Sequence, residues 1–270
     1  MPSKEDCSMF TPNPEKMQIE EFSIYWERFG TGPKVVLCIT GLLGDITYSF
    51  YPVWRKLDPT KYTLIGLDLP GYGNSRPPDR NYFRPGQEFI FERDARLAKK
   101  LMEQLGYQKF SIIGSSGGGT VGFHIACHFP DFVEKLVICN TPFEIIERDA
   151  LVFRFLSNLD NWPNDQKAYI LRKYGRNYAE DVVKSWERYL QVELPAQSHT
   201  KRLQRNLENH LKAPTLCVLG LKDSVVPPDG ARKMKERLPN MKIHEVTYGQ
   251  HDHLSFLSEF VRVTENFLLN

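Results

Sequence analysis

The sequence has no apolar run long enough to cross a membrane. Its longest continuous apolar stretches, such as those at residues 35–39 and 136–139, have the length of a β-strand, whereas a membrane-spanning helix needs about 20 apolar residues. The first residues also lack the apolar core of a signal peptide and the arginine enrichment of a mitochondrial transit peptide. We therefore expect a cytoplasmic protein without a membrane span.

Neither sign of charge is in large excess. The 270 residues include 35 basic and 33 acidic side chains, spread along the chain, for a formal net charge of +2. Because there is no basic block and no basic–aromatic stripe, the composition argues against a nucleic-acid partner. With 41% hydrophobic residues the chain has a globular composition. We expect a small-molecule substrate and a monomer or weak oligomer.

Cysteines are few, and their spacing is not paired. The chain has five, of which Cys38, Cys139 and Cys217 fall in apolar, strand-like runs and Cys127 in a predicted helix. An odd number without paired spacing predicts buried, reduced thiols in an intracellular protein, not a disulfide set or a zinc site.

What the chain does have is a series of short apolar runs separated by longer amphipathic segments. Residues 17–30 alternate like half-exposed antiparallel strands, and continuous runs follow at 35–39, 62–67, 110–113, 136–139, 215–219 and 242–246. This alternation is typical of a parallel sheet covered on both faces by helices, a doubly wound α/β fold. The clearest helix ends at Gly106, a C-terminal cap, after an apolar stripe of Leu97, Leu101, Met102 and Leu105.

The strand pattern is interrupted by one long helical stretch. We therefore divide the chain into a loose arm, a core and a helical insert after the sixth strand, at residues 1–16, at 17–140 with 211–270, and at 141–210. Such an insert forms a lid over the carboxyl ends of the strands, or it adds packing to the sheet. It is rich in aromatic residues that either line an apolar pocket or fill its own core: Trp162, Tyr169, Tyr174, Tyr178 and Trp186.

A glycine-rich segment stands directly after one predicted strand and before a predicted helix. From Gly114 to Gly118 it reads Gly-Ser-Ser-Gly-Gly, the G-x-S-x-G pattern of a nucleophile elbow, which holds a serine in a strained turn. Glycines two positions away on both sides relieve the crowding only for Ser116, not for Ser115. A phosphate-binding turn is the alternative, but neither G-x-G-x-x-G nor a following lysine is present.

A serine hydroxyl needs a base to remove its proton and an acid to orient that base. After an elbow of this kind, the acid and then the histidine follow the serine in the chain. Asp223 comes after the run at 215–219, and His251 comes after the run at 242–246. We predict Ser116, Asp223 and His251 as a catalytic triad, with His253 as the alternative base.

The developing oxyanion requires backbone N–H donors. One is expected from Gly117, and the other from the loop at 40–44, where Leu43 or Leu42 donates. No metal and no organic cofactor are needed for this chemistry.

Two further segments resemble a known family. Residues 68–75 read Asp-Leu-Pro-Gly-Tyr-Gly-Asn-Ser, which resembles the D-x-x-G-x-G-x-S turn common in α/β-hydrolases. With Arg-Pro-Pro-Asp-Arg at 76–80 and Phe-Glu-Arg-Asp-Ala at 91–95, the chain resembles the biphenyl hydrolase-like (valacyclovir hydrolase) family over about residues 17–270. The resemblance implies an α/β-hydrolase fold and hydrolysis of carboxylic esters. It assigns the catalytic and oxyanion roles to Ser116, Asp223, His251, Leu43 and Gly117.

One position departs from that family. Its members carry an aspartate directly after the nucleophile, which holds the ammonium of amino acid esters, and here that residue is Gly117. An acid of the insert, such as Glu144 or Glu147, is a candidate replacement. We therefore expect cleavage of short or aromatic neutral esters. The alternatives are a carbon–carbon bond hydrolase or cofactor-free haloperoxidase with the same triad, and a non-catalytic binding protein. The family also has mitochondrial members, which this N-terminus does not support.

Overall fold

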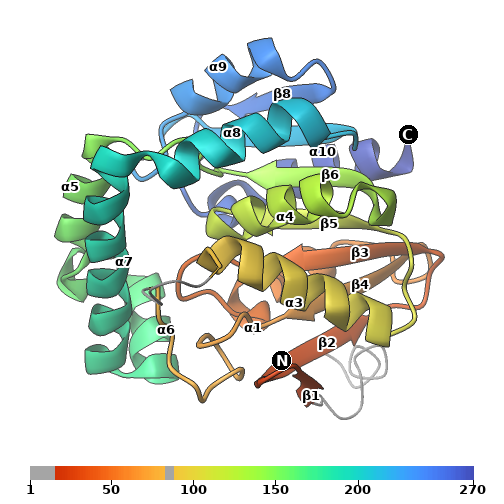
Figure 1. The fold of residues 1–270 in the computed structure, drawn as a ribbon. Helices are drawn as coiled ribbons and strands as arrows, with labels where there is room; N and C mark the ends of the chain where they lie inside the picture. Colours follow the sequence, from red (N-terminus) through yellow and green to blue (C-terminus); the bar gives the residue numbers. More distant parts are fainter. Residues whose placement is uncertain (1–15, 83–87) are drawn as a thin grey trace.

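A single mixed sheet forms the centre of the molecule (Figure 1). The structure is a computed structural model that describes residues 16–82 and 88–270. The sheet has the order β1-β2-β4-β3-β5-β6-β7-β8, in which β2 runs antiparallel to β1 and β4 and the later strands are parallel. Its strands are β1 Lys16–Ile19, β2 Phe22–Phe29, β3 Lys34–Ile39, β4 Tyr62–Leu67, β5 Phe110–Ser115, β6 Val133–Cys139, β7 Thr215–Gly220 and β8 Met241–Val246.

Helices cover both faces of this sheet, which explains why its parallel strands are continuously apolar. Side chains alternate between the faces along each strand, so that Leu37 and Ile39 pack in one core cluster and Val36 and Cys38 in the other. The first cluster lies under α3 Ile90–Gln104, α4 Gly117–His128, α8 Ser198–His210 and α9 Asp229–Arg237. The second lies under α1 Ile46–Ser49, α2 Tyr51–Trp54 and α10 Leu257–Leu269.

The insert after β6 is helical, as predicted. It comprises α5, α6, α7 and α8, the first three at Glu147–Leu156, Asn164–Tyr174 and Arg176–Ala196. In Figure 1, α5, α6 and α7 stand beside the sheet, whereas α8 returns along α4. The mostly parallel α/β sheet with an insert after its sixth strand is confirmed.

Helix α3 ends as the sequence predicts. Gly106 has a φ of +85°, which side chains disfavour and glycine accepts. The N–H of Gly106 donates to the carbonyl of Glu103, and the N–H of Tyr107 donates to that of Met102, both at 2.9 Å. These are the two hydrogen bonds of a Schellman motif.

The predictions on the N-terminal arm and the cysteines can be compared with the structure only for the residues that it describes. Most of the predicted arm at 1–16, including Cys7, lies outside it, and Lys16 already begins β1. The four described cysteines are free and buried, as predicted: Cys38, Cys127, Cys139 and Cys217. Within the described ranges, none of the helices combines the length and apolar character needed to cross a bilayer.

The loop after β4, which carries the family-like turn, is fixed by a buried ion-pair network. Asp94 of α3 contacts Arg80 at 2.6 Å and Arg93 at 2.8 Å, and its side chain is fully buried. The Arg80 guanidinium also donates to the carbonyl of Pro70 at 3.0 Å. Asp94 therefore holds Arg80, and through it the start of this loop at Pro70, against α3.

Asp94→Ala should destabilise the fold by about 3–5 kcal/mol, because it leaves two guanidinium groups without their shared carboxylate. Urea unfolding measures the loss. The matched control is Asp79→Ala, which removes a largely exposed partner of Arg76 and should change the midpoint little. Equal losses in both variants would contradict the role of Asp94.

Candidate active site

Ser116 sits in a sharp turn between β5 and α4, where the sequence predicts an elbow. Its φ and ψ are 52° and −125°, a combination that residues with a side chain rarely adopt and that costs on the order of 1–3 kcal/mol. Its N–H donates to the carbonyl of Cys139 at the end of β6, at 2.8 Å. The strained turn is thus tied to the neighbouring strand.

The glycines around Ser116 permit this turn by their lack of a side chain. A Cβ on Gly118 would lie 2.1 Å from the carbonyl oxygen of Ile39, and one on Gly114 would lie 2.6 Å from the oxygen of Gly118. Gly117 is different, because a Cβ there would make ordinary contacts, 3.5 Å from the Phe91 ring and 4.0 Å from the Cα of Gly41. Gly114 and Gly118 are therefore required by packing, whereas Gly117 is not.

Three loops bring Ser116, Asp223 and His251 together. The His251 Nε2 lies 3.1 Å from the Ser116 Oγ, and the His251 Nδ1 lies 2.8 Å from an Asp223 carboxylate oxygen. The other Asp223 oxygen accepts hydrogen bonds from the backbone N–H groups of Val225 and Val226, at 2.7 and 2.8 Å. Because the buried carboxylate accepts from Nδ1–H, Nε2 is left unprotonated and faces the hydroxyl.

His253, the alternative base, points elsewhere. Its Nε2 lies 2.8 Å from the carbonyl oxygen of Ser49, and its Nδ1 lies 3.1 Å from the Oγ of Ser115. The carbonyl accepts from Nε2–H, so Nδ1 accepts from the Ser115 hydroxyl. Burial lowers the pKa of His253. The two adjacent serines thus contact two different histidines, and only Ser116 is next to His251.

The loop after β3 lies against the elbow. Gly41 approaches so closely that a Cβ on it would lie 3.0 Å from the Cβ of Ser116. The N–H of Gly44 donates to the carbonyl of Gly41 at 3.1 Å, and Leu43 has a φ of +54° with its side chain in the core. The structure thus brings this loop to Ser116 and Gly117. That the backbone N–H of Leu43 or Leu42 donates to an oxyanion stays a prediction.

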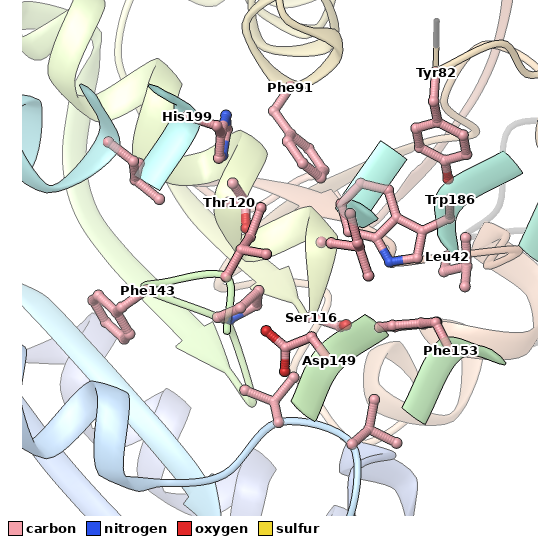
Figure 2. Close-up of a pocket in the computed structure, with 18 of the residues that line it drawn as sticks. Leu42, Tyr82, Phe91, Ser116, Thr120, Phe143, Asp149, Phe153, Trp186 and His199 are labelled. Carbon is pink, nitrogen blue, oxygen red and sulfur yellow. The ribbon is translucent and has the colours of Figure 1, made fainter. Parts of the chain in front are cut away.

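An aromatic pocket opens beside Ser116 (Figure 2). The Trp186 ring lies edge-on to Phe91 and Phe153, with centroid distances of 5.7 and 6.0 Å. Further walls come from Leu42, Tyr82 and Phe143. Residues of the insert and of the core both line the pocket, which therefore lies between helices α5 and α7 and the ends of the strands.

The aromatic residues of the insert divide between the site and the loops of the core. Trp186 lines the pocket, and Trp162 and Tyr169 line an adjoining cavity that also reaches Ser116 and His251.

Three tyrosine hydroxyls of the insert bind core loops. Tyr169 donates to Asp45 at 2.6 Å, Tyr174 accepts from the N–H of Gly73 at 2.7 Å, and Tyr178 accepts from the N–H of Arg80 at 3.0 Å.

A carboxylic acid that the sequence reasoning missed lies in the pocket wall. Asp149, in the first turn of α5, lines the pocket and accepts from the N–H of Ile146 at 3.0 Å. Burial raises its pKa to about 6. Of the two expected acids, Glu147 is exposed, and Glu144 lines the pocket but lies 3.5 Å from Lys233. An acid three residues after a helix cap is ordinary, so the sequence carries no signal for this role.

Comparisons with known proteins identify the family of the chain. A family model described as alpha/beta hydrolase fold matches residues 34–172. "Serine hydrolase BPHL" of Mus musculus is 30% identical over 259 residues, which cover 94% of this chain and 85% of the relative. A pimeloyl–acyl-carrier-protein methyl ester esterase of Legionella pneumophila is 24% identical over 270 residues, which cover 91% of this chain and 99% of the esterase.

Among solved structures, the enol-lactonase from Burkholderia xenovorans LB400 superposes with a TM-score of 0.74. The match covers 94% of this chain and 100% of the lactonase at 17% identity. At that identity the likeness shows the fold alone.

Two adjacent glycines give a matched test of the elbow. Gly118→Ala should destabilise the fold by about 3 kcal/mol, because its methyl group meets a strand carbonyl that cannot move aside. Gly117→Ala should leave the stability nearly unchanged. Thermal unfolding compares the two, and a stable Gly118→Ala would contradict the packing described above.

Proposed function

The chain belongs to the α/β-hydrolase fold family, and a serine hydrolase of the biphenyl hydrolase-like kind is among its relatives. On that premise, we propose that the chain cleaves carboxylic esters through an acyl-enzyme on Ser116. The observation that carries the proposal is the contact of the His251 Nε2 with the Ser116 Oγ at 3.1 Å, with Asp223 behind the imidazole. An unprotonated nitrogen at this distance is positioned to take the hydroxyl proton.

The reaction has two half-steps. His251 takes the proton of Ser116 as the oxygen attacks the ester carbonyl, and then gives that proton to the departing alcohol. Asp223 stabilises the imidazolium without becoming protonated. Backbone N–H groups of Gly117 and of Leu43 or Leu42 hold the oxyanion. Water, activated by His251, then releases the acid product.

The pocket supports small to medium substrates with an aromatic or apolar group. Phe91, Phe153 and Trp186 offer ring faces and edges beside the nucleophile, which favour flat apolar groups. We assign the helices at 141–210 that line this pocket the role of a lid. Glu144 and Asp149 are carboxylates that line this pocket. Glu144 lies near Lys233, so we propose Asp149 as a determinant of preference for cationic esters.

The rival functions differ in what they demand of the same residues. A binding protein does not need a serine, a histidine and a buried aspartate in continuous contact, so this arrangement favours catalysis. A carbon–carbon bond hydrolase or a haloperoxidase would use the same triad. Turnover on esters, compared with turnover on vinylogous diketones and with halide oxidation by peroxide, separates the three.

Adjacent serines give a matched test of the nucleophile. Ser116→Ala should abolish covalent labelling by a fluorophosphonate probe and reduce ester turnover to background. His251→Ala should slow both by about 10²–10⁴-fold, because general base catalysis is lost. Ser115→Ala removes only the hydroxyl that contacts His253 and should keep the labelling, with a stability loss of about 1 kcal/mol. Labelling that persists in Ser116→Ala would refute the mechanism.

A charge-matched pair of esters tests Asp149. The two esters differ in one group, a trimethylammonium in one and a neutral tert-butyl in the other. Asp149 is ionised above its pKa of about 6 and neutral below it. The ratio of kcat/KM for the cationic ester to that for the neutral one should therefore rise about tenfold from pH 5 to pH 8, equivalent to about 1.4 kcal/mol.

Using the ratio cancels every pH effect that is common to the two esters. In Asp149→Asn, whose amide oxygen still accepts from Ile146, the ratio should stay flat and the neutral ester should be cleaved at nearly the wild-type rate. A pH-dependent ratio in that variant would assign the preference to another group.

A further inference from the structure

A second cluster of chemically reactive side chains lies on the α3–α4 side of the sheet, apart from the triad. It consists of Glu92 on α3 with His124 and His128 on α4, and one ligand atom from each lies within 4.8 Å of the others. The two histidines are four residues apart, which places them on the same face of the helix. Helices α3 and α4 pack together, and this brings the glutamate to that face.

His124 is buried without hydrogen-bond partners. Its side chain is 1% exposed, and neither ring nitrogen has a hydrogen-bond partner among the described residues. Buried polar atoms nearly always have one, because an unpartnered group loses its hydration without replacement. The nearest carboxylate oxygen, of Glu92, is 3.8 Å from the His124 Nδ1, too far for a hydrogen bond.

Neighbouring side chains on α8 position the other two groups. Arg202 donates to one Glu92 oxygen at 2.9 Å, and the other oxygen is the one nearest His124. The side-chain amide of Asn206 lies 3.3 Å from the Nε2 of His128, and with its oxygen turned to that nitrogen it accepts from Nε2–H and leaves Nδ1 free to bind a metal ion. Outer contacts of this kind orient ligands in metal sites. Arg202 also brings a positive charge, which Glu92 compensates.

From this geometry we propose that Glu92, His124 and His128 bind a divalent transition-metal ion of the zinc class. Two imidazoles and a carboxylate suit zinc, whose tetrahedral ligands lie about 3.3 Å apart at bond lengths of about 2.0–2.1 Å. Their ligand atoms, which lie within 4.8 Å of one another, would have to draw together to reach this spacing. Solvent or His199, whose Nδ1 is also buried and unpartnered, completes the coordination.

The ion would join α3 to α4 behind the aromatic pocket. Glu92 follows Phe91 in the chain, and His124 lies one turn after Thr120, and both Phe91 and Thr120 line the pocket. His199 lines the same pocket, and Figure 2 shows it among the lining residues. The proposed ion takes no part in the Ser116 reaction. It supplies a cross-link that fixes the pocket wall.

An ordinary core histidine is the competing explanation. It accounts for the burial of His124, but it leaves both ring nitrogens unpaired. The ion pair with Arg202 accounts for the position of Glu92, but nothing in that explanation pairs the ring nitrogens of His124.

Metal binding to the untagged protein tests the proposal. After chelator treatment, Co²⁺ titration should saturate at one equivalent per chain with the visible absorption of a tetrahedral site. Zn²⁺ should displace the cobalt and raise the thermal midpoint, since an ion that binds only the folded state stabilises it. Absence of a saturable cobalt spectrum in the wild type overturns the proposal.

Two substitutions and a matched control locate the site. His128→Ala and Glu92→Gln should each weaken zinc affinity at least about tenfold, measured by competition with a chromophoric chelator. His210→Ala, at the end of α8, is the control, because both His128 and His210 are exposed histidines in the last turn of a helix. It should bind as the wild type does. Wild-type zinc affinity in His128→Ala would also overturn the proposal. In the wild-type protein, fluorophosphonate labelling of Ser116 should be the same with and without zinc.

Discussion

The close approach of the elbow to two strand ends is the constraint on which the site depends. Ser116 is tied by its N–H to β6, and Gly118 lies directly against the last carbonyl of β3. This packing fixes the hydroxyl relative to the loop after β3, which supplies one expected oxyanion donor. The reacting groups are therefore positioned by the sheet itself. Backbone strain at one residue is tolerated because the surrounding parallel strands leave the turn no other conformation.

Much of this could be predicted because the relevant signals are local. The apolar run at 62–67 coincides with β4, and Gly106 ends α3 as its position indicates. The triad residues come together because each follows a parallel strand, and the carboxyl ends of such strands meet at one edge of the sheet. Strand order and chain order were therefore enough to bring Asp223 and His251 to Ser116 without knowledge of any side-chain contact.

The sequence could not predict contacts that arise only where separate helices meet. Asp149 resembles any acid in a first helical turn, and it becomes part of the pocket only because α5 lies over the strand ends. His124 looks like a polar residue in a glycine-rich helix, and its isolation depends on how α3 and α8 cover α4. The same holds for the aromatic residues of the insert, since helical spacing does not tell a tyrosine that lines a cavity from one that binds a core loop.

The tyrosine contacts of the insert have a consequence for the substrate that the pocket accepts. Tyr174 and Tyr178 tether the junction of α6 and α7 to the loop after β4, which Asp94 in turn anchors. Helix α5 carries large apolar side chains in solvent instead, with Leu151 62% and Phe155 61% exposed. Helix α5 is nevertheless tied to the core as well, because Arg148 donates to the carbonyl of Ser224 at 2.8 Å. A substrate of the proposed reaction must therefore fit a pocket whose helical walls are held to the core on both sides.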